Sequence, residues 1–416
     1  MHILYLGNVT MGTSADGSSS SRISPAGQGY QASLLRELKR AGCRITIVGT
    51  SPHPTYPEGP LLVRGTRSDG EQIAQYRPSY LNVRFLSVLS GMLSVVLTGL
   101  RAARRDGKAD VVMFYNPDLQ YGLGAILIAA LARISSVGIL ADYNPPEDWT
   151  RIKQTVKNRW LDTTRRWIMR RLDGAVALSS AFRELTSGPM LIVEGGVSVE
   201  GQSAESSDAE PTNAEDKAII AYTGRLDRRR GIGLLMDAVE LMEHSAIELR
   251  ITGHGPLADE VEDRDQNSDR IQFLGFVSKA EYQRLLAQAT VCVVPQRTSY
   301  AFSRYCFPSK LLEYLAMGKP VVTTDVGDVR TLYGDHVIVL DRDQETPKGL
   351  AQLLDEVLAT DPAELERQAH TAQAYVLREK RWERQAQRIL EFLETDRDQP
   401  SGDRAQNTRE SCEHSV

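Results

Sequence analysis

Cysteine is scarce in this 416-residue sequence, and its four cysteines show no paired spacing. Cys43 and Cys292 lie in apolar, strand-like runs, which predicts buried reduced thiols in a cytoplasmic protein rather than a disulfide framework. The N-terminus lacks a basic segment followed by a long apolar core, so no secretion signal is expected. The longest apolar stretch, residues 85–100, is interrupted by Ser, Thr and Gly and is short for a bilayer crossing, which favours a helix packed on a sheet over membrane contact.

A strong charge of one sign is also missing, because 49 basic and 54 acidic residues leave a net charge of -5. The protein therefore has no overall positive electrostatic field that would attract nucleic acid, so no nucleic-acid partner is expected. The sequence has no cluster of His, Cys and Asp with metal-ligand spacing, and no Asp-x-Asp in a suitable donor loop. We therefore expect no catalytic metal and no other cofactor.

Short apolar runs that are typical of buried parallel strands alternate with helical patterns in both halves of the chain. They comprise residues 3–6, 45–48, 111–114, 138–141 and 176–178, and then 219–223, 249–252, 271–274, 291–294, 320–324 and 336–340. This pattern predicts an α/β protein of two Rossmann-like, doubly wound domains that face a cleft. The predicted units are an N-terminal domain (1–200), a polar linker (201–217), a C-terminal domain (218–394) and a disordered polar tail (395–416).

Two segments of the second half are candidates for binding an anion. The first runs from Thr223 to Gly231, where Gly224 allows close backbone approach and Arg225 and Arg230 can bind phosphate, although clustered arginines often form only a solvated surface. The second is a helix that is expected to begin near Pro308 and to end near Gly318.

The start of this second helix combines several groups that suit a nucleotide. Its free N–H groups and positive dipole end at Ser309 favour a phosphate. Lys310 and Glu313 share one face of the helix, so the lysine can neutralise a diphosphate while the carboxylate accepts hydrogen bonds from ribose hydroxyls. The simpler interpretation is a surface ion pair.

Four motifs occur in order between residues 219 and 325: the Gly-Arg-Leu turn at 224–226, the turns at 251–256 and 274–277, and the Pro-Ser-Lys to Gly-Lys-Pro-Val helix at 308–321. Together they resemble the donor domain of retaining glycosyltransferases of the two-Rossmann (GT-B) type, family 4 (group 1) or a near relative. The resemblance covers the second half well and the first half only in outline.

The resemblance implies a donor site residue by residue. Its members here are Gly224, Arg225, Arg230, Gly253, Gly255, Phe276, Val277, Ser309, Lys310 and Glu313. Arg230 stands where the family has lysine, a departure that keeps the charge. Tyr305 stands where the family has the first of two glutamates, which leaves the donor sugar open, and His254 is expected to be structural.

In the first half, Gly27 and Gly29 follow the first strand and resemble a glycine-rich loop that approaches the donor phosphate or the acceptor. This Gly-x-Gly lacks the third glycine of a dinucleotide fingerprint, so a nicotinamide enzyme is a poor alternative. Two further sets of residues follow predicted strands, and either can be no more than a loop. They are Asn116, and then Asn144, Glu147, Asp148 and Trp149, of which Glu147 or Asp148 is the candidate base toward an acceptor hydroxyl.

These residues predict a metal-independent, retaining glycosyltransferase that moves a sugar from a nucleotide-diphosphate donor to a glycan, a lipid-linked or a small-molecule acceptor. The alternatives are a nucleotide-sugar-binding protein without turnover and a nucleotide-sugar epimerase of the same architecture. The helix at 160–172 carries Arg165, Arg166, Arg170 and Arg171 beside apolar residues, which is a solvated basic face or a peripheral contact with the inner face of a membrane. The oligomeric state is not predicted.

Overall fold

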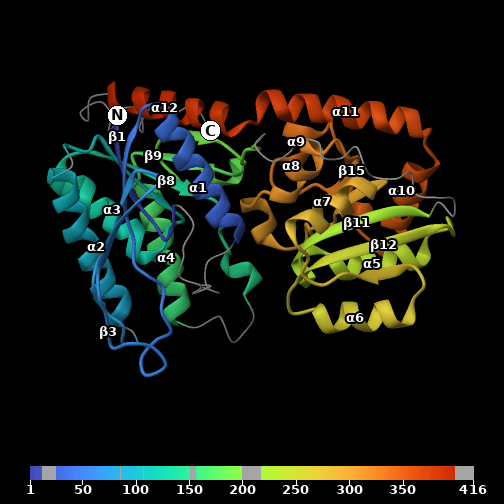
Figure 1. Ribbon diagram of the computed structural model, residues 1–416, viewed down its shortest axis with the longest axis horizontal. Helices are drawn as coiled ribbons and strands as arrows, with labels where there is room; N and C mark the ends of the chain where they lie inside the picture. Colours follow the sequence, from blue (N-terminus) through green and yellow to red (C-terminus); the bar gives the residue numbers. More distant parts are fainter. Residues whose placement is uncertain (12–24, 85, 106, 150–155, 199–216, 399–416) are drawn as a thin grey trace, which may run out of the picture.

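The computed structural model describes residues 1–11, 25–84, 86–105, 107–149, 156–198 and 217–398, which form two α/β units joined side by side (Figure 1). Residues 201–216 of the predicted linker and the tail beyond Asp398 lie outside the described residues. Residues 395–398, which were predicted to belong to a disordered tail, instead continue the last helix.

The first unit is built on an eight-stranded sheet with the order β10-β9-β8-β7-β1-β2-β5-β4. Its strands are β1 (His2–Leu6), β2 (Arg44–Val48), β4 (Thr66–Gly70), β5 (Ile73–Arg77), β7 (Val111–Tyr115), β8 (Ser135–Leu140), β9 (Gly174–Ala177) and β10 (Met190–Ile192). Neighbouring strands are parallel except β4 and β5, which pair antiparallel. The five strands predicted for this half are confirmed, and β3 (Leu62–Val63) pairs antiparallel with β6 (Tyr80–Leu81) in a separate two-stranded sheet.

Helices cover both faces of this sheet, as alternate residues of β1 show. Ile3 and Tyr5 join one buried cluster with residues of α1 (Pro25–Arg40), whereas Leu4 and Leu6 join a second cluster. The second cluster contains residues of α2 (Leu86–Arg105), α3 (Leu119–Ala132) and α4 (Val156–Arg171). Because side chains alternate across a strand, buried residues at successive positions place a central strand between two helical layers.

The second unit has a six-stranded parallel sheet with the order β13-β12-β11-β14-β15-β16. Its strands are β11 (Ala218–Arg225), β12 (Ile247–His254), β13 (Ile271–Phe273), β14 (Val291–Val294), β15 (Val321–Thr324) and β16 (Ile338–Leu340). All six predicted strands are confirmed. Its helices are α5 (Ile232–Leu241), α6 (Ala258–Asn267), α7 (Lys279–Gln288), α8 (Ser309–Ala316), α9 (Val329–Tyr333), α10 (Pro347–Ala359) and α11 (Pro362–Glu379).

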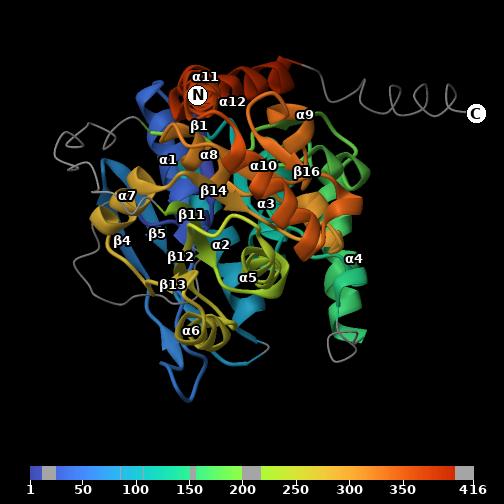
Figure 2. The same cartoon turned by 90° about the vertical axis from the view of Figure 1, so that its right-hand side faces the viewer.

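The last helix, α12 (Trp382–Asp398), returns to the first unit, although the sequence boundary at 394 groups it with the second. It packs against α1, while α11 packs against α8, so the two red helices in Figures 1 and 2 extend over both units. The return is fixed at the backbone, because Val197 N–H donates to the carbonyl of Lys380 (2.8 Å) and Trp382 N–H donates to that of Val197 (3.2 Å).

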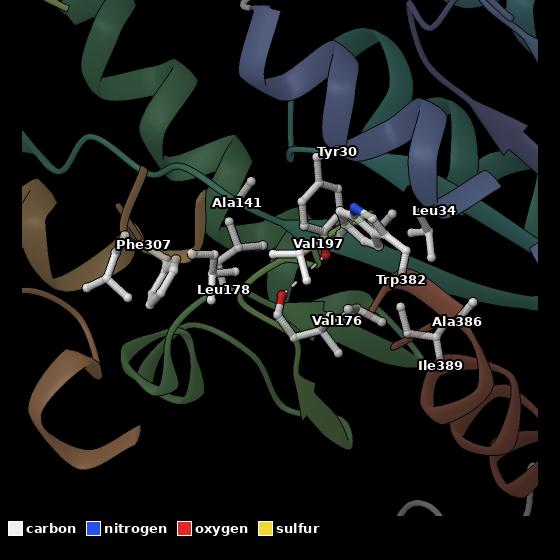
Figure 3. Close-up of a cluster of buried hydrophobic side chains, with 14 of the residues drawn as sticks. Tyr30, Leu34, Ala141, Val176, Leu178, Val197, Phe307, Trp382, Ala386 and Ile389 are labelled. Carbon is white, nitrogen blue, oxygen red and sulfur yellow. Dashed lines mark hydrogen bonds between the residues drawn. The ribbon is translucent and has the colours of Figure 1, made fainter. Parts of the chain in front are cut away.

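A shared apolar core lies beneath this crossing. Figure 3 shows Trp382 of α12 against Tyr30 of α1, and the two rings meet edge to face at 4.9 Å between centroids. The same cluster continues through Val197 and Leu178 to Phe307 of the second unit. The junction between the two units is therefore a continuous buried core rather than a bare linker.

Candidate functional site

Three turns of the second unit lie side by side at the carboxyl edge of its sheet. The parallel register of β11 and β12 pairs Gly224 with Gly253 and Arg225 with His254. The third turn joins them, because Gly253 N–H and the Thr252 hydroxyl both donate to the carbonyl of Gly275, at 2.9 and 2.7 Å. The turns that the sequence resemblance singled out separately thus form one surface, at the edge where open parallel sheets bind ligands.

Two of the glycines are required by this close approach. Gly253 has φ +146°, and a Cβ there would lie 1.7 Å from the carbonyl oxygen of Gly224. At Gly255 a Cβ would lie 2.3 Å from the carbonyl oxygen of Leu226. Neither position has room for a side chain, so only glycine lets the neighbouring turns pack this closely.

The two predicted phosphate-binding arginines have different surroundings. Arg225 is exposed, and its Nε donates to Asp227 at 3.0 Å. Asp227 also accepts from the backbone N–H of Arg230 at 2.9 Å, which caps the short helix η3 (Arg228–Arg230). Arg230 is half-buried, with its guanidinium 5.6 Å from the centroid of the Phe302 ring.

Gln296, which the sequence analysis missed, holds Arg230 in place. Its Oε1 accepts from Nη1 of Arg230, while its Nε2 donates to Ser303 at 3.3 Å and to Cys306 Sγ at 2.9 Å. Gln296 is buried, so its amide bonds orient the arginine rather than a ligand. No charge or motif marks a glutamine after β14, and only its partners reveal this role.

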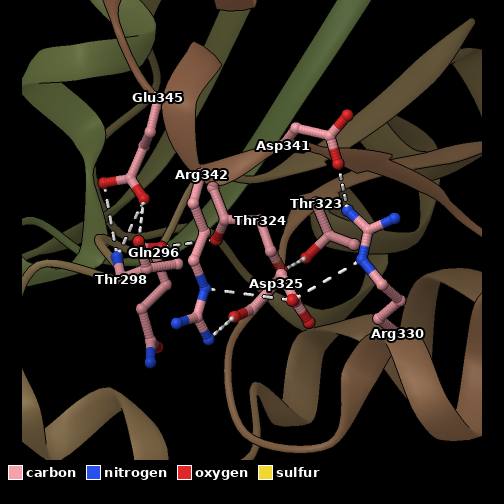
Figure 4. A network of polar contacts seen from close by, with 9 residues as sticks. All are labelled: Gln296, Thr298, Thr323, Thr324, Asp325, Arg330, Asp341, Arg342 and Glu345. Atoms are coloured by element: carbon pink, nitrogen blue, oxygen red, sulfur yellow. Dashed lines mark hydrogen bonds and ion pairs between the residues drawn. The ribbon is translucent and has the colours of Figure 1, made fainter.

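A polar network continues from Gln296 along the ends of β14, β15 and β16, as Figure 4 shows. The Thr324 hydroxyl donates to the carbonyl of Gln296, and buried Glu345 accepts from the Thr298 backbone at 3.0 Å. Asp325, at the end of β15, forms ion pairs with Arg330 and Arg342 at 3.5 and 3.9 Å. These contacts fix the loops on the opposite side of β11 from the glycine turns.

The helix α8 begins and ends where the sequence predicts, at Pro308 and before Gly318, whose φ is +67°. Lys310 Nζ donates to Glu313 Oε2 at 2.7 Å, which confirms that the two share a face, and lies 4.6 Å from the ring centroid of Tyr282. The Tyr282 hydroxyl also donates to Glu313 Oε2 at 2.7 Å. Ser309 is exposed at the first position of the helix, where the N–H groups are free of intrahelical partners.

Lys310 and the glycine turn at the end of β11 are linked through the next turn of α8. Tyr314 is buried, and its hydroxyl oxygen accepts from Thr223 N–H at 2.9 Å, directly before Gly224. The helix start is thereby held against the strand that carries Arg225.

Phe276 and Val277 follow β13 at the far side of this surface. Phe276 is 85% exposed and forms an edge-to-face pair with the His254 ring, 6.2 Å away between centroids, whereas Val277 is half-buried. An apolar ring left this open is available to stack on a flat ligand. The roles of Phe276 and Val277 remain predictions.

The first unit meets this surface through the loop after β8. Arg229, another residue that the sequence analysis missed, donates from Nη1 to Asn144 Oδ1 at 3.0 Å and lies over the rings of Tyr300 and Phe302. Burial of the carboxyl raises the pKa of Asp142 in the same loop, and the charge of Arg230 opposes this rise. The carboxyl edges of the two sheets are therefore in direct contact.

Two of the acceptor-side candidates support loops in this structure. Asn116 has φ +58°, and its Oδ1 accepts from the backbone N–H groups of Ala141 and Asp142 at 2.9 and 3.1 Å, which fixes the loop after β8. Asn144 accepts from Arg229 across the junction. Their amides thus bind protein groups, and contact with a ligand remains a prediction.

Asp148 binds the start of a short helix instead of facing an open position. It belongs to η1 (Pro146–Asp148), and its two carboxylate oxygens accept from the backbone N–H groups of Ala301 (2.8 Å) and Phe302 (2.7 Å) in η4 (Ala301–Tyr305). These hydrogen bonds cap the start of η4 from across the junction of the two units. This structural role does not fit a catalytic base that accepts a proton from the acceptor. The neighbouring Glu147 is exposed, so it remains the candidate base toward an acceptor hydroxyl.

Gly27 and Gly29 lie within the first five residues of α1 rather than in a loop, which corrects the sequence interpretation. A Cβ at Gly27 would lie 3.4 Å from the Tyr115 hydroxyl, while nothing lies within 4 Å of one at Gly29. Tyr30, directly after Gly29, anchors the start of α1 in the shared core. Residues 12–24, which precede this helix, lie outside the described residues.

Across the residues that the structure describes, no group of three or more His, Cys, Asp or Glu side chains is arranged to hold a metal ion. The predicted phosphate ligands Arg225, Arg230 and Lys310 are among the positive groups near the turns. All three belong to the second unit.

Both halves of the chain match models of known families. Residues 217–360 match the family described as glycosyl transferases group 1, and residues 27–191 match the glycosyl transferase 4-like domain. The chain belongs to the group 1 glycosyltransferases. This confirms the resemblance that the four motifs of the second half carry.

Relatives of this glycosyltransferase are similar over about a third of the chain. An uncharacterized glycosyltransferase of Methanocaldococcus jannaschii is 29% identical over 149 residues, which cover 35% of this chain and 37% of that protein. The amylovoran biosynthesis glycosyltransferase AmsK of Erwinia amylovora is 25% identical over 144 residues, or 33% and 34% of the two chains. The match thus spans about a third of the length of these relatives.

Solved structures share the GT-B fold over nearly the whole glycosyltransferase. Sucrose-phosphate synthase from Thermosynechococcus elongatus has a TM-score of 0.68 at 18% identity and covers 95% of this chain and 99% of its own. HepE of Anabaena, in complex with UDP-glucose, has a TM-score of 0.65 at 16% identity and covers 95% and 100%. The predicted arrangement of two Rossmann-like domains is confirmed.

Proposed function

We propose that this glycosyltransferase moves a sugar from a nucleotide-diphosphate donor, bound by the second unit, to an acceptor hydroxyl on the first. The observation that carries the proposal is the gathering of Arg225, Arg230 and the start of α8 with Lys310 at one sheet edge, beside glycine turns that exclude side chains. Fixed cations and free helix N–H groups are what a pyrophosphate requires. HepE, with the same fold, binds UDP-glucose, which supports a donor of this class.

The transfer is proposed to proceed with retention and without a metal. The bond from the anomeric carbon to the diphosphate oxygen breaks, the acceptor oxygen bonds to the same face of that carbon, and the acceptor proton passes to the departing phosphate. Arg225, Arg230 and Lys310 stabilise the charge that develops on the leaving group. Glu313 then accepts hydrogen bonds from the ribose, and Phe276 lies beside the base.

The acceptor is proposed to be a glycan or a lipid-linked molecule. AmsK acts in amylovoran biosynthesis by its name, which supports a polysaccharide pathway for this chain as well. A reducing, cytoplasmic compartment agrees with Cys43, Cys292 and Cys306, which are free and buried among the described residues. Burial raises the pKa of the Cys292 thiol to about 12, so this sulfur stays protonated and unreactive.

Calorimetric titration with a panel of nucleoside diphosphates tests the donor site. Lys310→Ala and Arg230→Ala should each weaken binding by about tenfold to a hundredfold, because each removes a charge-assisted bond to phosphate. Arg228→Ala is the matched control, since Arg228 is an exposed neighbour in η3, and it should bind as the parent does. Equal binding by all three variants would contradict the proposed site.

Product analysis separates transfer from its alternatives. A panel of nucleotide sugars is incubated with and without acceptor extracts, and the anomeric configuration of the product is read by NMR. Transfer predicts a glycoside with the donor's configuration and release of nucleoside diphosphate. A changed nucleotide sugar without acceptor indicates an epimerase, and binding without turnover indicates a binding protein, the reading that Tyr305 in place of the first glutamate favours.

A further inference from the structure

Tyr282 of α7 joins the two charged groups of α8 that the proposed donor site uses, although no sequence motif includes it. Its hydroxyl donates to Glu313 Oε2 at 2.7 Å, and Lys310 Nζ donates to the same oxygen at 2.7 Å. Lys310 Nζ also lies 3.3 Å from the Tyr282 hydroxyl oxygen and 4.6 Å from the centroid of the ring. The tyrosine, the carboxylate and the ammonium group therefore form a closed cluster in which each contacts the other two.

This cluster is more than an ion pair on the surface of one helix. Lys310 and Glu313 are three positions apart on α8, and such a pair forms without help from another element. Here a residue of a different helix bonds the carboxylate and also presents an aromatic face to the ammonium group. These added contacts fix the direction of both charged side chains, which a pair of flexible side chains alone does not.

The position of Tyr282 is itself fixed by the start of α7. Ser278 and Glu281 form a capping box there, in which Ser278 Oγ accepts from Glu281 N–H at 3.3 Å and Glu281 Oε2 accepts from Ser278 N–H at 2.8 Å. Tyr282 N–H donates to the carbonyl of Ser278 at 2.9 Å, and Leu285 and Leu286 in the next turn are buried. A capped and packed helix start thus holds the tyrosine on a rigid element.

The surroundings of the Tyr282 hydroxyl keep it a hydrogen-bond donor. Burial, and next the charge of Glu313, raise the pKa of this hydroxyl above its ordinary value, so it stays protonated while Glu313 is ionised. Because Tyr282 and Lys310 both bond Oε2, the carboxylate is held in one orientation. Its other oxygen, Oε1, forms no hydrogen bond with the described residues, and the side chain is 45% exposed.

The open oxygen suits the ligand that Glu313 is proposed to bind. A carboxylate oxygen without a protein donor is free to accept hydrogen bonds from the hydroxyls of a ribose. Without the Tyr282 hydroxyl, the carboxylate would be free to rotate and give both oxygens to the ammonium group of Lys310, which would take the acceptor away from the ribose. The tyrosine hydroxyl thereby leaves Oε1 to the ligand.

We propose that Tyr282 is a positioning residue of the donor site, whose hydroxyl aims the Glu313 carboxylate at the ribose and whose ring holds Lys310 beside the diphosphate. The proposal rests on the proposed function, because it requires a nucleoside diphosphate at the start of α8. It goes further by assigning to a residue of α7 the selection of a ribose that carries both hydroxyls. The hydroxyl and the ring have separate roles, which two substitutions distinguish.

Calorimetric titration tests the role of the hydroxyl with UDP, ADP and GDP and with their 2′,3′-dideoxy counterparts, which lack the ribose hydroxyls. The parent should bind the ribose form of its preferred nucleotide about tenfold or more tightly than the dideoxy form, because only the ribose form bonds the carboxylate. Tyr282→Phe keeps the ring but removes the hydroxyl, so this ribose preference should fall to about threefold or less. Glu313→Ala, at a partly exposed position, should lose the preference as well.

Tyr282→Leu tests the role of the ring. It removes the aromatic face as well as the hydroxyl, so the affinity for the nucleoside diphosphate should fall about threefold to tenfold below that of Tyr282→Phe. Tyr375→Phe is the matched control, because it removes the hydroxyl of another half-buried tyrosine of the second unit, whose ring packs on His336 in place of the cluster. Its affinity and its ribose preference should equal those of the parent.

A double variant gives a readout that a general loss of structure does not produce. In the Glu313→Ala background, Tyr282→Phe should not change the ribose preference further, because the hydroxyl acts through that carboxylate. A full preference in Tyr282→Phe or in Glu313→Ala, an equal loss in Tyr375→Phe, or a further loss in the double variant would overturn the proposal. A parent that binds diphosphates without preferring ribose would overturn it but leave the proposed diphosphate site standing, whereas a parent that binds none of the nucleotides would overturn both.

Discussion

Tyr305 of the second unit packs edge to face against Tyr143 of the first, with 5.1 Å between the ring centroids and 89° between the planes. Its ring also meets Phe182 at 5.4 Å, and only 5% of the residue is exposed. This is the position where the family resemblance places the first glutamate, near the donor sugar. In this chain the position instead belongs to the core of the first unit and joins the two units.

Restoring the glutamate at this position should destabilise the protein rather than add a sugar contact. Tyr305→Glu removes a buried ring and places a carboxylate near Glu184, so we expect a loss of about 3–5 kcal/mol in the free energy of unfolding. Tyr305→Phe keeps the ring and should stay within about 1 kcal/mol of the parent. Guanidinium unfolding measures both. A stable, more active Tyr305→Glu variant would show that the side chain reaches the donor after all.

Apart from β4, β5 and β10, the strands of the two main sheets were predictable because each is a short apolar run between polar segments, as in Val111–Tyr115 and Val291–Val294. The strand β4 was not, since Thr66–Gly70 contains no apolar residue and is exposed except at its end. The destination of α12 was not predictable either. Its apolar face indicates that it packs on something, but not on which unit.

The candidate site likewise contains residues that the sequence predicts and residues whose role only the folded structure shows. Lys310 and Glu313 were predictable from their spacing on one helix, and the glycine turns from their motifs. Arg229 was hidden in a run of three arginines whose members differ only in what they touch after folding. Asp148 looked like a base because a carboxylate follows a strand, and only the amides of Ala301 and Phe302, from the other unit, give it another role.

Asp148→Asn tests that role. Asparagine keeps the shape but turns an N–H₂ group toward one of the two amides, so the unfolding free energy should fall by about 1–2 kcal/mol. Turnover by the variant should depend on pH at the acidic side as turnover by the parent protein does, because the substitution removes no catalytic base. Glu147→Gln is the matched comparison at the exposed neighbour. If Asp148→Asn abolished that dependence and reduced turnover by about a thousandfold, Asp148 would be the base.

The burial of Asp118 should make the free energy of unfolding depend on pH. Asp118 caps α3 by accepting from Tyr121 N–H at 2.8 Å, and burial raises its pKa from 3.8 to about 6, against the opposing Tyr121 bond and Arg165. The folded state therefore binds the proton more tightly than the unfolded state, so this group lowers stability as the pH rises from about 4 to 6.

Asp118→Asn should remove that loss while keeping the cap, since asparagine caps helices as well as aspartate does. The variant should gain about 1–2 kcal/mol over the parent above pH 6 and less than that below pH 4. Urea unfolding at several pH values measures the difference. Asp361→Asn, which changes the exposed cap of α11 in the same way, is the matched control. A difference for Asp118→Asn that stays constant with pH would contradict the prediction.

The final prediction concerns the buried ion pair at the crossing of the chain between the units. Lys380 Nζ lies 3.1 and 3.3 Å from the two carboxylate oxygens of Glu194, and both residues are buried. Lys380→Met leaves the Glu194 carboxylate without its partner in the core, so the unfolding free energy should fall by about 3–5 kcal/mol. Adding Glu194→Gln removes the stranded charge, so the double variant should be more stable than the single Lys380→Met variant.

Arg36→Met is the control, because it breaks the part-exposed pair of Arg36 and Glu71 and should lower the unfolding free energy by no more than about 1 kcal/mol. Guanidinium unfolding measures the stability of all these variants. If the double variant is no more stable than Lys380→Met, packing around the aliphatic part of the lysine, and not the pairing of charges, stabilises this junction.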